Sequence, residues 1–197
     1  MRNSLQKRTW AQVSLHNNSH NYRPIRAALP EGCRFLGVVK ADAYGHGAVA
    51  VARLLESEGA DYLAVSCLDE AMELRSAGIT MPLLILGHTP SEYTETLIDN
   101  DITQTVSCLA KAQEFSARAA ALGRQLRIHI KIDTGMSRLG FLCGGDSFDE
   151  GVANVIASCR LPGLLENRGV GELLVEYLAR REVTPVQLED ILVELLP

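Results

Sequence analysis

The sequence predicts an α/β protein built on a parallel sheet, and two observations predict it. Short runs rich in Val, Ile and Leu alternate with longer segments whose apolar residues recur at helical spacing, which is typical of successive strand–helix units. Turn residues such as Gly32, Gly78 and Gly123 separate the segments. With 197 residues, 47% hydrophobic and 22% charged, the chain suits a packed globular core.

Five strands are expected in this sheet. The first is rich in Val, Leu and Phe, a composition that suits a strand buried on both faces. A partly alternating run at residues 8–15 is expected to be an edge strand. The five strands of the sheet are expected at residues 34–41, 62–66, 82–87, 103–107 and 126–133.

A helix is expected before the first strand and after each of the first four. The first helix would place Tyr22, Ile25, Ala28 and Leu29 on one face. The similarity among the units is expected to be architectural, without a repeated sequence motif. The helices are expected at residues 16–29, 48–58, 69–77, 91–100 and 109–122.

The number of units predicts an incomplete barrel. Right-handed crossovers place every strand-to-helix loop at one end of the sheet, which carries the active site in a (β/α)8 barrel. A full barrel needs eight units and about 250 residues, so five units leave an open sheet or a partial TIM barrel. Beyond Pro162-Gly163 the strand pattern is expected to stop, with helices at 171–181 and 186–196. We therefore expect a partial barrel over residues 1–164 and a helical tail over 165–197.

Composition and charge exclude several classes of protein. The net charge of −5 argues against nucleic-acid binding, and no apolar run has the length of a membrane span or the pattern of a signal peptide. Five cysteines without a CxxC pair indicate reduced thiols in a cytoplasmic protein. His16 and His20 lie four residues apart on an expected helix without an evident third ligand, so we expect no metal site.

The strongest indication of chemistry is the run VVKADAYGHG at residues 38–47. A lysine at the end of an apolar strand is costly to bury while charged, and desolvation favours the neutral amine, which attacks carbonyl groups to form imines. Tyr44 follows Lys40 by four residues, and Gly45 and Gly47 permit close approach of a ligand. The alternative is a lysine that extends from the strand end into solvent. The crowding of polar residues beside Lys40 favours a site.

A second candidate run, HIKIDTGMSRLG, covers residues 129–140. Lys131 alternates with apolar neighbours and so points to one face of its strand. Arg138 stands in a glycine-rich loop beyond the strand, where a guanidinium can hold a carboxylate or phosphate through two hydrogen bonds. The alternative is an ion pair of Arg138 with Asp133 that only fixes the loop, and this run alone favours neither.

Together the two runs resemble the signatures of the alanine racemase family, fold-type III enzymes that use pyridoxal phosphate. VVKADAYGHG is similar to the cofactor-lysine signature, and KIDTGMSRLGF to the second signature, in which Gly is more usual than Ser137. The opening RTWAQVSLHNNSHNYRPIRAALP and the segments YLAVSCLDEAMELRSAGI and PLLILGHTP also resemble the family. The resemblance covers residues 8–164.

The resemblance implies roles for four residues. Lys40 would form the internal aldimine with pyridoxal 5'-phosphate and exchange the α-proton on the D-amino-acid side, and Tyr44 would hydrogen-bond the cofactor phosphate. Arg138 would orient the substrate carboxylate, and Lys131 matches a lysine that is carbamylated in some members and positions that arginine. The implied substrate is alanine and the implied assembly is a homodimer, with no nucleic-acid or membrane partner.

The resemblance ends at Leu164, whereas family members continue through three more barrel strands and a β-rich C-terminal domain. That part carries the tyrosine that serves as the base on the opposite face, so we expect a truncated chain. Three hypotheses stay open: a pyridoxal-phosphate-dependent racemase of alanine, or of serine; a fragment that captures the cofactor without turnover; and an inert remnant whose tail helices pair with another chain. The two runs together favour the first two.

Overall fold

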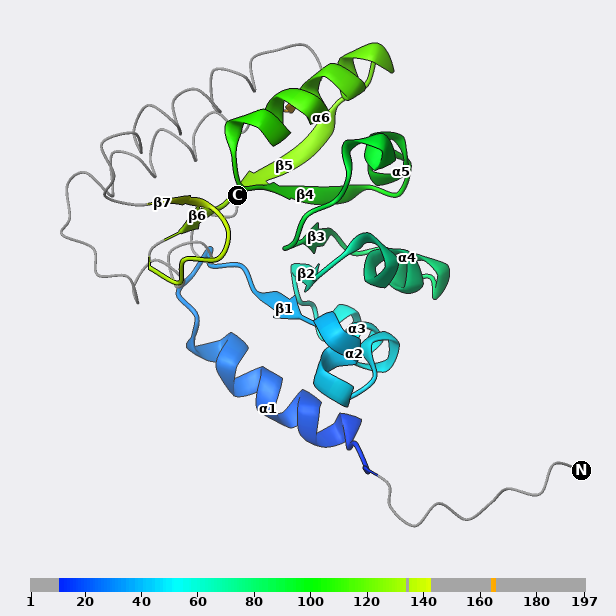
Figure 1. Ribbon diagram of the computed structural model, residues 1–197. Coiled ribbons are helices and arrows are strands. Elements are labelled where there is room, and N and C mark those ends of the chain that lie inside the picture. The colour runs from blue at the N-terminus through cyan, green and yellow to red at the C-terminus, as the bar shows by residue number, and fades with distance from the viewer. Residues whose placement is uncertain (1–10, 134, 143–163, 166–197) are drawn as a thin grey trace, which may run out of the picture.

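The computed structural model describes residues 11–133, 135–142 and 164–165. Its main sheet is parallel, with six strands in the order β1-β2-β3-β4-β5-β8. Figure 1 shows β1 to β5 in this order. Strands that are consecutive in the sequence are neighbours in the sheet, as successive strand–helix units require. The predicted α/β class and partial TIM barrel are therefore confirmed. The strands are β1 (Leu36–Val38), β2 (Tyr62–Val65), β3 (Leu83–Ile85), β4 (Ile102–Val106), β5 (Leu126–Ile130) and β8 (Leu164–Leu165); β6 (Ile132–Asp133) pairs with β7 (Phe141–Leu142) separately.

All five predicted helices are present, and those that follow strands cover one face of the sheet (Figure 1). The fourth one begins as a 3-10 turn, η1, and continues as α5. No helix in the described part of the chain has the length and apolar character needed to cross a bilayer. The helical elements are α1 (Leu15–Ala28), α2 (Lys40–Gly45), α3 (Ala48–Ser57), α4 (Leu68–Ser76), η1 (Ser91–Tyr93), α5 (Thr94–Asp99) and α6 (Leu109–Ala121).

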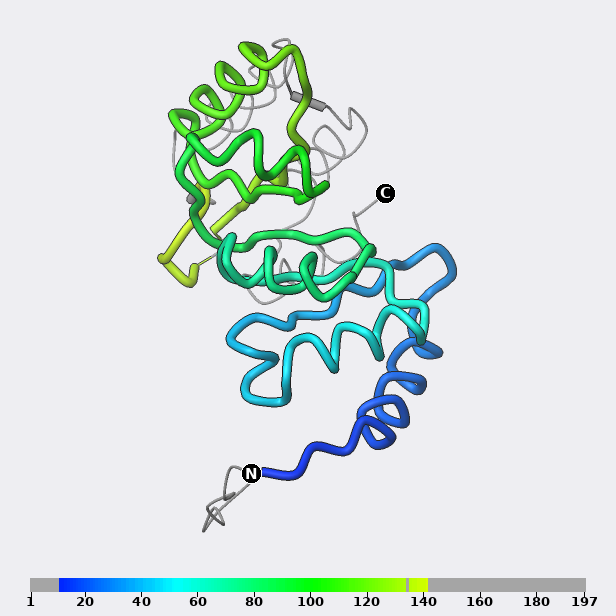
Figure 2. The backbone as a smooth tube through the Cα atoms, turned by 90° about the vertical axis from the view of Figure 1, so that its right-hand side faces the viewer, coloured from blue at the N-terminus to red at the C-terminus, as the bar shows by residue number. Residues whose placement is uncertain are grey.

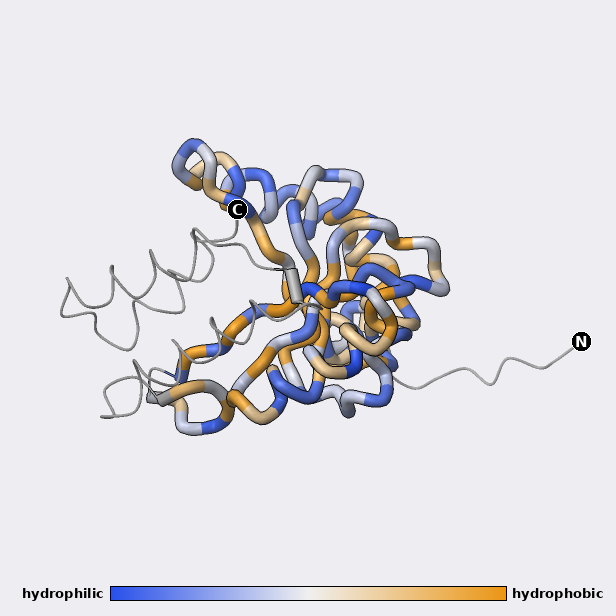
Figure 3. The backbone as a smooth tube through the Cα atoms, turned by 90° about the horizontal axis from the view of Figure 1, so that it is seen from above, coloured by the Kyte–Doolittle hydropathy of each residue, from blue (hydrophilic) through white to orange (hydrophobic). Residues whose placement is uncertain are grey.

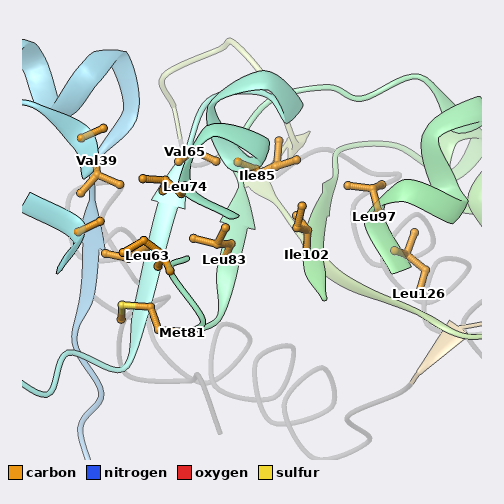
Figure 4. Close-up of a cluster of buried hydrophobic side chains, with 14 of the residues drawn as sticks. Val39, Leu63, Val65, Leu74, Met81, Leu83, Ile85, Leu97, Ile102 and Leu126 are labelled. Carbon is orange, nitrogen blue, oxygen red and sulfur yellow. The ribbon is translucent and has the colours of Figure 1, made fainter. Parts of the chain in front are cut away.

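The hydrophobic core lies between the sheet and these helices (Figure 4). Alternate residues of the strands, such as Leu63 and Val65 in β2 and Leu83 and Ile85 in β3, are fully buried there together with Leu74 of α4. Figure 3 shows the hydrophobic residues gathered along the strands, with polar residues on the outer loops and helices. This core fixes the strand ends, from which the candidate site projects.

Helix α1 packs against α3, at the margin of this layer (Figure 2). Its first turn is capped by Ser14, whose hydroxyl oxygen accepts the N–H of Asn17 at 3.2 Å. Further along, Ser19 and Arg23 both donate to the carboxylate of Glu58, the residue that ends α3. These contacts fix α1 on the side of the β1 unit.

Two expectations about the first strands are wrong. The first strand ends at Val38 and does not continue to Ala41. Residues 11–14 form no strand, and the rest of the edge strand predicted at 8–15 lies outside the described residues or within α1. The short helix α2, which begins at Lys40, was not predicted.

The chain also adds a strand where the strand pattern was expected to stop. Leu164 pairs in parallel with Leu126, which makes β8 the sixth strand. A strand of two residues is too short to show an alternating pattern in the sequence. The helices predicted at 171–181 and 186–196 lie outside the described residues, and the division of the chain at residue 164 stays a prediction.

The expectation that no motif repeats is wrong at one place. The segments VSCLDEA (65–71) and VSCLAKA (106–112) share five of seven residues, and each leads from a strand into a helix, β2 into α4 and β4 into α6. Cys67 and Cys108 are the respective N-caps, both with extended backbone. Their carbonyl oxygens accept the N–H groups of Ala71 at 3.2 Å and Ala112 at 3.3 Å. The repeated motif therefore builds the same junction in two alternate units.

Candidate active site

The chain turns in an unusual way directly after β1. Four successive residues, from Ala41 to Tyr44, have left-handed backbone conformations, with φ between 51° and 54°. An L-residue in a left-handed helix costs about 1–2 kcal/mol, so four cost about 4–8 kcal/mol. Such strain persists only where the surrounding structure enforces it, and it concentrates at functional sites.

Main-chain and side-chain hydrogen bonds fix the left-handed turn at both ends. At its start, Val39 donates to the carbonyl of Ala64 in β2 and accepts the N–H of Ala43, both at 2.9 Å. At its end, the Asp42 carboxylate accepts the N–H of Ala48 at 2.7 Å, which ties the turn to the beginning of α3. Ala43 is buried. The turn is thus part of the packed structure.

The turn brings together the first two predicted site residues. The Nζ atom of Lys40 lies 5.9 Å from the centroid of the Tyr44 ring. Lys40 is half-buried, whereas Tyr44 is 65% exposed, an unusual position for a large aromatic side chain. An amine and a phenol therefore stand side by side at the carboxyl end of β1, accessible to a small molecule.

Glu70, in the first turn of α4, is a further residue of this site that the sequence did not reveal. Its Oε1 accepts the N–H of Ala41 at 2.8 Å, and its Oε2 accepts the N–H of Ser66 at 2.7 Å. Partial burial opposes ionisation, but the N–H donors of Ser66 and Ala41 and the nearby charge of Lys40 keep the pKa of Glu70 below its ordinary value. In the sequence, Glu70 stands out only as one of two acidic residues in the first turn of a helix, which the helix dipole favours.

The end of β2 is in turn tied to the next two strands. A Cβ added to Gly87 would lie 2.4 Å from the carbonyl oxygen of Ser66. The two main-chain segments therefore approach each other more closely at Gly87 than a side chain would permit. Gln104 is fully buried in β4 and donates through Nε2 to the carbonyl of Gly87 at 2.8 Å. The carboxyl ends of β2, β3 and β4 are therefore tied to one another, and β2 in turn contacts the Lys40 turn.

The second candidate run forms a loop held by Asp133. The Oδ1 atom of Asp133 accepts the N–H groups of Gly135 at 2.9 Å and Ser137 at 3.0 Å. These donors, that of Gly135 first, keep the pKa of Asp133 below its ordinary value. Arg138 is exposed, and none of the ion pairs among the described residues includes it. The alternative of an Arg138–Asp133 ion pair is therefore wrong: Asp133 holds the loop through main-chain groups.

The conformation of this loop shows why glycine is more usual than Ser137 in the signature that the run resembles. Ser137 has a φ of 57°, the left-handed conformation that a glycine adopts without strain. Gly140 has a φ of 124°, and a Cβ there would lie 2.8 Å from the amide nitrogen of Asp133. Lys131, half-buried at the base of the loop, accepts the N–H of Phe141 at its carbonyl at 2.9 Å.

Both runs lie at the same edge of the sheet, as predicted. Leu139 borders a small cavity with Leu86 and Thr105, at the carboxyl ends of β3 and β4. Lys40 and Lys131 follow strands four places apart, which corresponds to about 19 Å in a flat sheet. Among the described residues, no hydrogen bond or ion pair joins the Lys40–Tyr44 pair to Lys131 or Arg138. The structure thus forms two half-sites along one curved edge.

Fold and site together define a partial (β/α)8 barrel whose reactive groups, centred on an amine, lie at the carboxyl edge of the strands. Residues 13–177 match the family model of the alanine racemase N-terminal domain, and this match includes Lys40, Tyr44, Lys131 and Arg138. The chain belongs to the alanine racemase family.

Individual relatives agree with this assignment. The chain is 46% identical over 155 residues to the alanine racemase of Clostridium perfringens strain SM101, which covers 79% of this chain and 39% of that protein. It resembles the structure of alanine racemase from Clostridium difficile 630 in complex with cycloserine, with a TM-score of 0.74, 45% identity and coverage of 82% of this chain and 43% of the other. A histidine racemase from Leuconostoc mesenteroides matches with a TM-score of 0.66 and 26% identity, over 78% of this chain and 40% of the other. The chain thus spans about two-fifths of the length of the relatives it matches.

The donor groups of the site fit the cofactor that the family resemblance implies. Pyridoxal phosphate carries an aldehyde, which needs an amine, and a phosphate, which needs hydrogen-bond donors. Lys40 offers the amine, and the adjacent phenol of Tyr44 offers a donor within the same turn. No carboxylate among the described residues pairs with the Lys40 amine as a salt bridge, so the amine is available to a ligand.

Proposed function

We propose that this chain binds pyridoxal 5'-phosphate through Lys40 and acts in the racemisation of alanine. The observation that carries the proposal is the Lys40–Tyr44 pair, held by a strained turn at the carboxyl end of β1 in a member of the alanine racemase family. When bound, the cofactor delocalises the electron pair left on the substrate Cα after loss of its proton. The roles below concern the residues of this chain.

In this proposal Lys40 holds the cofactor and moves a proton. Its Nζ atom takes the α-proton on one face of the substrate or returns it, and a proton exchanged on the opposite face completes the inversion. Tyr44 donates its hydroxyl to the cofactor phosphate, and Arg138 orients the substrate carboxylate. Lys131 positions Arg138. We assign no residue of this chain to the opposite face.

The choice of alanine is supported by the names of the most similar relatives. A similar fold belongs to a histidine racemase, so the fold alone does not select the side chain of the substrate. Serine stays as the second substrate of the same proposal. The homodimer and the cytoplasmic location also stay predictions.

The experiment that tests the proposal is a titration of the full chain with pyridoxal phosphate. Visible absorbance would report binding, and borohydride reduction followed by peptide mass spectrometry would locate the modified lysine. We expect the pyridoxyl mass on Lys40, its loss in Lys40→Arg, which keeps the charge, and its retention in Lys111→Arg. Alanine and serine racemisation would be assayed on the same samples by chiral chromatography.

The outcomes separate the three hypotheses. Modification of Lys40 with racemisation supports the enzyme. Modification without racemisation of either amino acid overturns the catalytic part and leaves a cofactor-binding chain. If folded protein gives no Lys40-dependent band, the function is wrong for this chain, and the family relationship describes only its ancestry.

A further inference from the structure

One carboxylate joins the loop that carries Lys40 to the next unit of the sheet. Glu70 accepts the N–H of Ser66 with one oxygen and the N–H of Ala41 with the other, at 2.7 Å and 2.8 Å. Ala41 is the first of the four left-handed residues and directly follows Lys40. Glu70 therefore contacts the main chain at the point where the backbone leaves the ordinary conformation.

The repeated motif supplies an internal control for what Glu70 does. In VSCLAKA the position of Glu70 is taken by Lys111, whose ammonium cannot accept a hydrogen bond and instead pairs with Glu114 at 2.7 Å. The β4–α6 junction nevertheless has the same extended cysteine cap and the same first helical hydrogen bond as β2–α4. The junction therefore forms without an acid at this position, although Lys111 makes neither of the two main-chain contacts of Glu70.

Of the two contacts of Glu70, the one that reaches beyond the junction is the hydrogen bond from Ala41 in the lysine-bearing turn. Ala41 is exposed, and without a protein partner its N–H would bond to water. The other acids of α4 nearby do not replace Glu70: Asp69 and Glu73 are exposed, and among the described residues their carboxylates accept no hydrogen bond. A carboxylate that bridges two main-chain donors fixes their separation, because each of its oxygens is held by a different chain segment.

We infer that Glu70 is a positioning residue for Lys40: it anchors on Ser66 and holds the left-handed turn through Ala41, so that the amine and Tyr44 stay side by side. The inference rests on the proposed role of Lys40 in binding the cofactor. Glu70 acts through the backbone and touches no reacting atom.

The first test needs no cofactor. Amide hydrogen exchange of the full chain would be followed by mass spectrometry in the wild type, Glu70→Gln and the matched variant Glu73→Gln, which removes the same charge one turn along α4. Because a glutamine can accept with only one atom, we expect exchange in the peptide covering residues 41–44 to be about tenfold faster in Glu70→Gln and unchanged in Glu73→Gln. Equal exchange in all three proteins overturns the inference.

The second test measures the reactivity of Lys40 itself. In the same three proteins, the rate at which pyridoxal phosphate modifies Lys40 would be measured after borohydride reduction, with Lys111 as the reference lysine within each sample. We expect about a tenfold lower rate at Lys40 in Glu70→Gln at an unchanged Lys111 rate, and wild-type rates in Glu73→Gln. A merely structural role would change the melting temperature and exchange throughout the sheet, and would not act on this turn alone.

The outcomes for Glu70 and for the proposed function are distinct. If the wild type captures no cofactor, the proposed function fails, whereas the exchange measurement still decides whether Glu70 holds the turn. If Glu70→Gln does not fold, nuclear magnetic resonance of the wild type replaces it: the amide signals of Ala41 and Ser66 must both shift as Glu70 is protonated, below the ordinary titration range of a glutamate. Independent behaviour of the two amides overturns the inference.

Discussion

The carboxylate of Asp42 accepts the main-chain N–H of Ala48 at 2.7 Å, so a residue in the middle of the left-handed turn caps the next helix. The N-cap residue of α3, Gly47, has no side chain with which to do this. Turn and helix are thereby coupled. A change that distorts residues 41–44 should therefore also disturb the cap of α3. Loss of the cap should in turn loosen residues 41–44.

Replacing Asp42 tests this coupling. We expect Asp42→Ala to lower the free energy of unfolding by about 1–2 kcal/mol, the usual cost of a lost cap, and the melting temperature by about 2–4 °C per kcal/mol. Asp42→Asn keeps an accepting oxygen and suits a left-handed backbone, so it should lose less than half as much. Thermal and urea unfolding measure both variants, and equal losses would contradict the cap.

The close approach of Gly87 to Ser66 leads to a second prediction. A methyl group at Gly87 meets a main-chain oxygen at 2.4 Å, whereas one at Gly37 meets the end of the Leu55 side chain at 2.6 Å. A side-chain end can rotate away and a paired strand cannot. We expect Gly87→Ala to destabilise the fold by about 1–3 kcal/mol and Gly37→Ala by clearly less, as measured by urea unfolding. The opposite order would show that the strand ends can separate.

The sequence predicted those parts of the fold that local patterns encode. Hydrophobic periodicity located the strands and helices within a few residues, because the core requires apolar side chains on one face of each element. The order of the units then placed Lys40 and Lys131 at one edge of the sheet. The pairing of Lys40 with Tyr44 was also visible, since both belong to one short run.

The remaining features depend on contacts between distant segments. Of the residues Ala-Asp-Ala-Tyr only the aspartate is tolerant of a left-handed backbone, which does not predict four such residues in succession. The turn is held by hydrogen bonds that involve Ala48 and Glu70, and Glu70 lies 29 residues along the chain from Ala41. A two-residue strand such as β8 exists only because β5 offers it a partner. Comparison of VSCLDEA with VSCLAKA could have drawn attention to Glu70, since Lys111 shows that the motif does not need the acid.

The stability of the fold depends on pH through the carboxyl group of Glu58. Hydrogen bonds from Arg23 and then Ser19 lower the pKa of this carboxyl to about 2, from an ordinary 4.5. A lowered pKa in the folded state means that the bonds stabilise fully above about pH 4.5 and are lost as the pH falls towards 2. We expect the stability of the wild type to fall more steeply over this range than that of Glu58→Gln, in urea unfolding at a series of pH values. The exposed Glu95→Gln is the control and should follow the wild type; a Glu58→Gln curve parallel to the wild type would contradict the assignment.

The loop that carries Arg138 supplies the last prediction. Asp133 accepts the N–H groups of Gly135 and Ser137, whereas Arg138 takes part in no described ion pair, so the carboxylate and not the guanidinium should hold the loop. We expect Asp133→Ala to speed amide exchange across residues 135–140 by about tenfold and Arg138→Ala to leave it unchanged. Asp133→Asn keeps one accepting oxygen without the charge and should fall between them.

Under the proposed function, Arg138→Ala and Asp133→Ala should also be distinguishable by their effects on ligand binding. Arg138→Ala should keep the capture of pyridoxal phosphate by Lys40 and weaken only the effect of an added amino acid on the visible band, because Arg138 is placed at the substrate carboxylate and not at the cofactor amine. Asp133→Ala should weaken that same effect through loss of loop order, with the exchange rates as its signature. Faster loop exchange in Arg138→Ala would mean that the guanidinium is a structural tie, and the role of Arg138 at the substrate would then have to be abandoned.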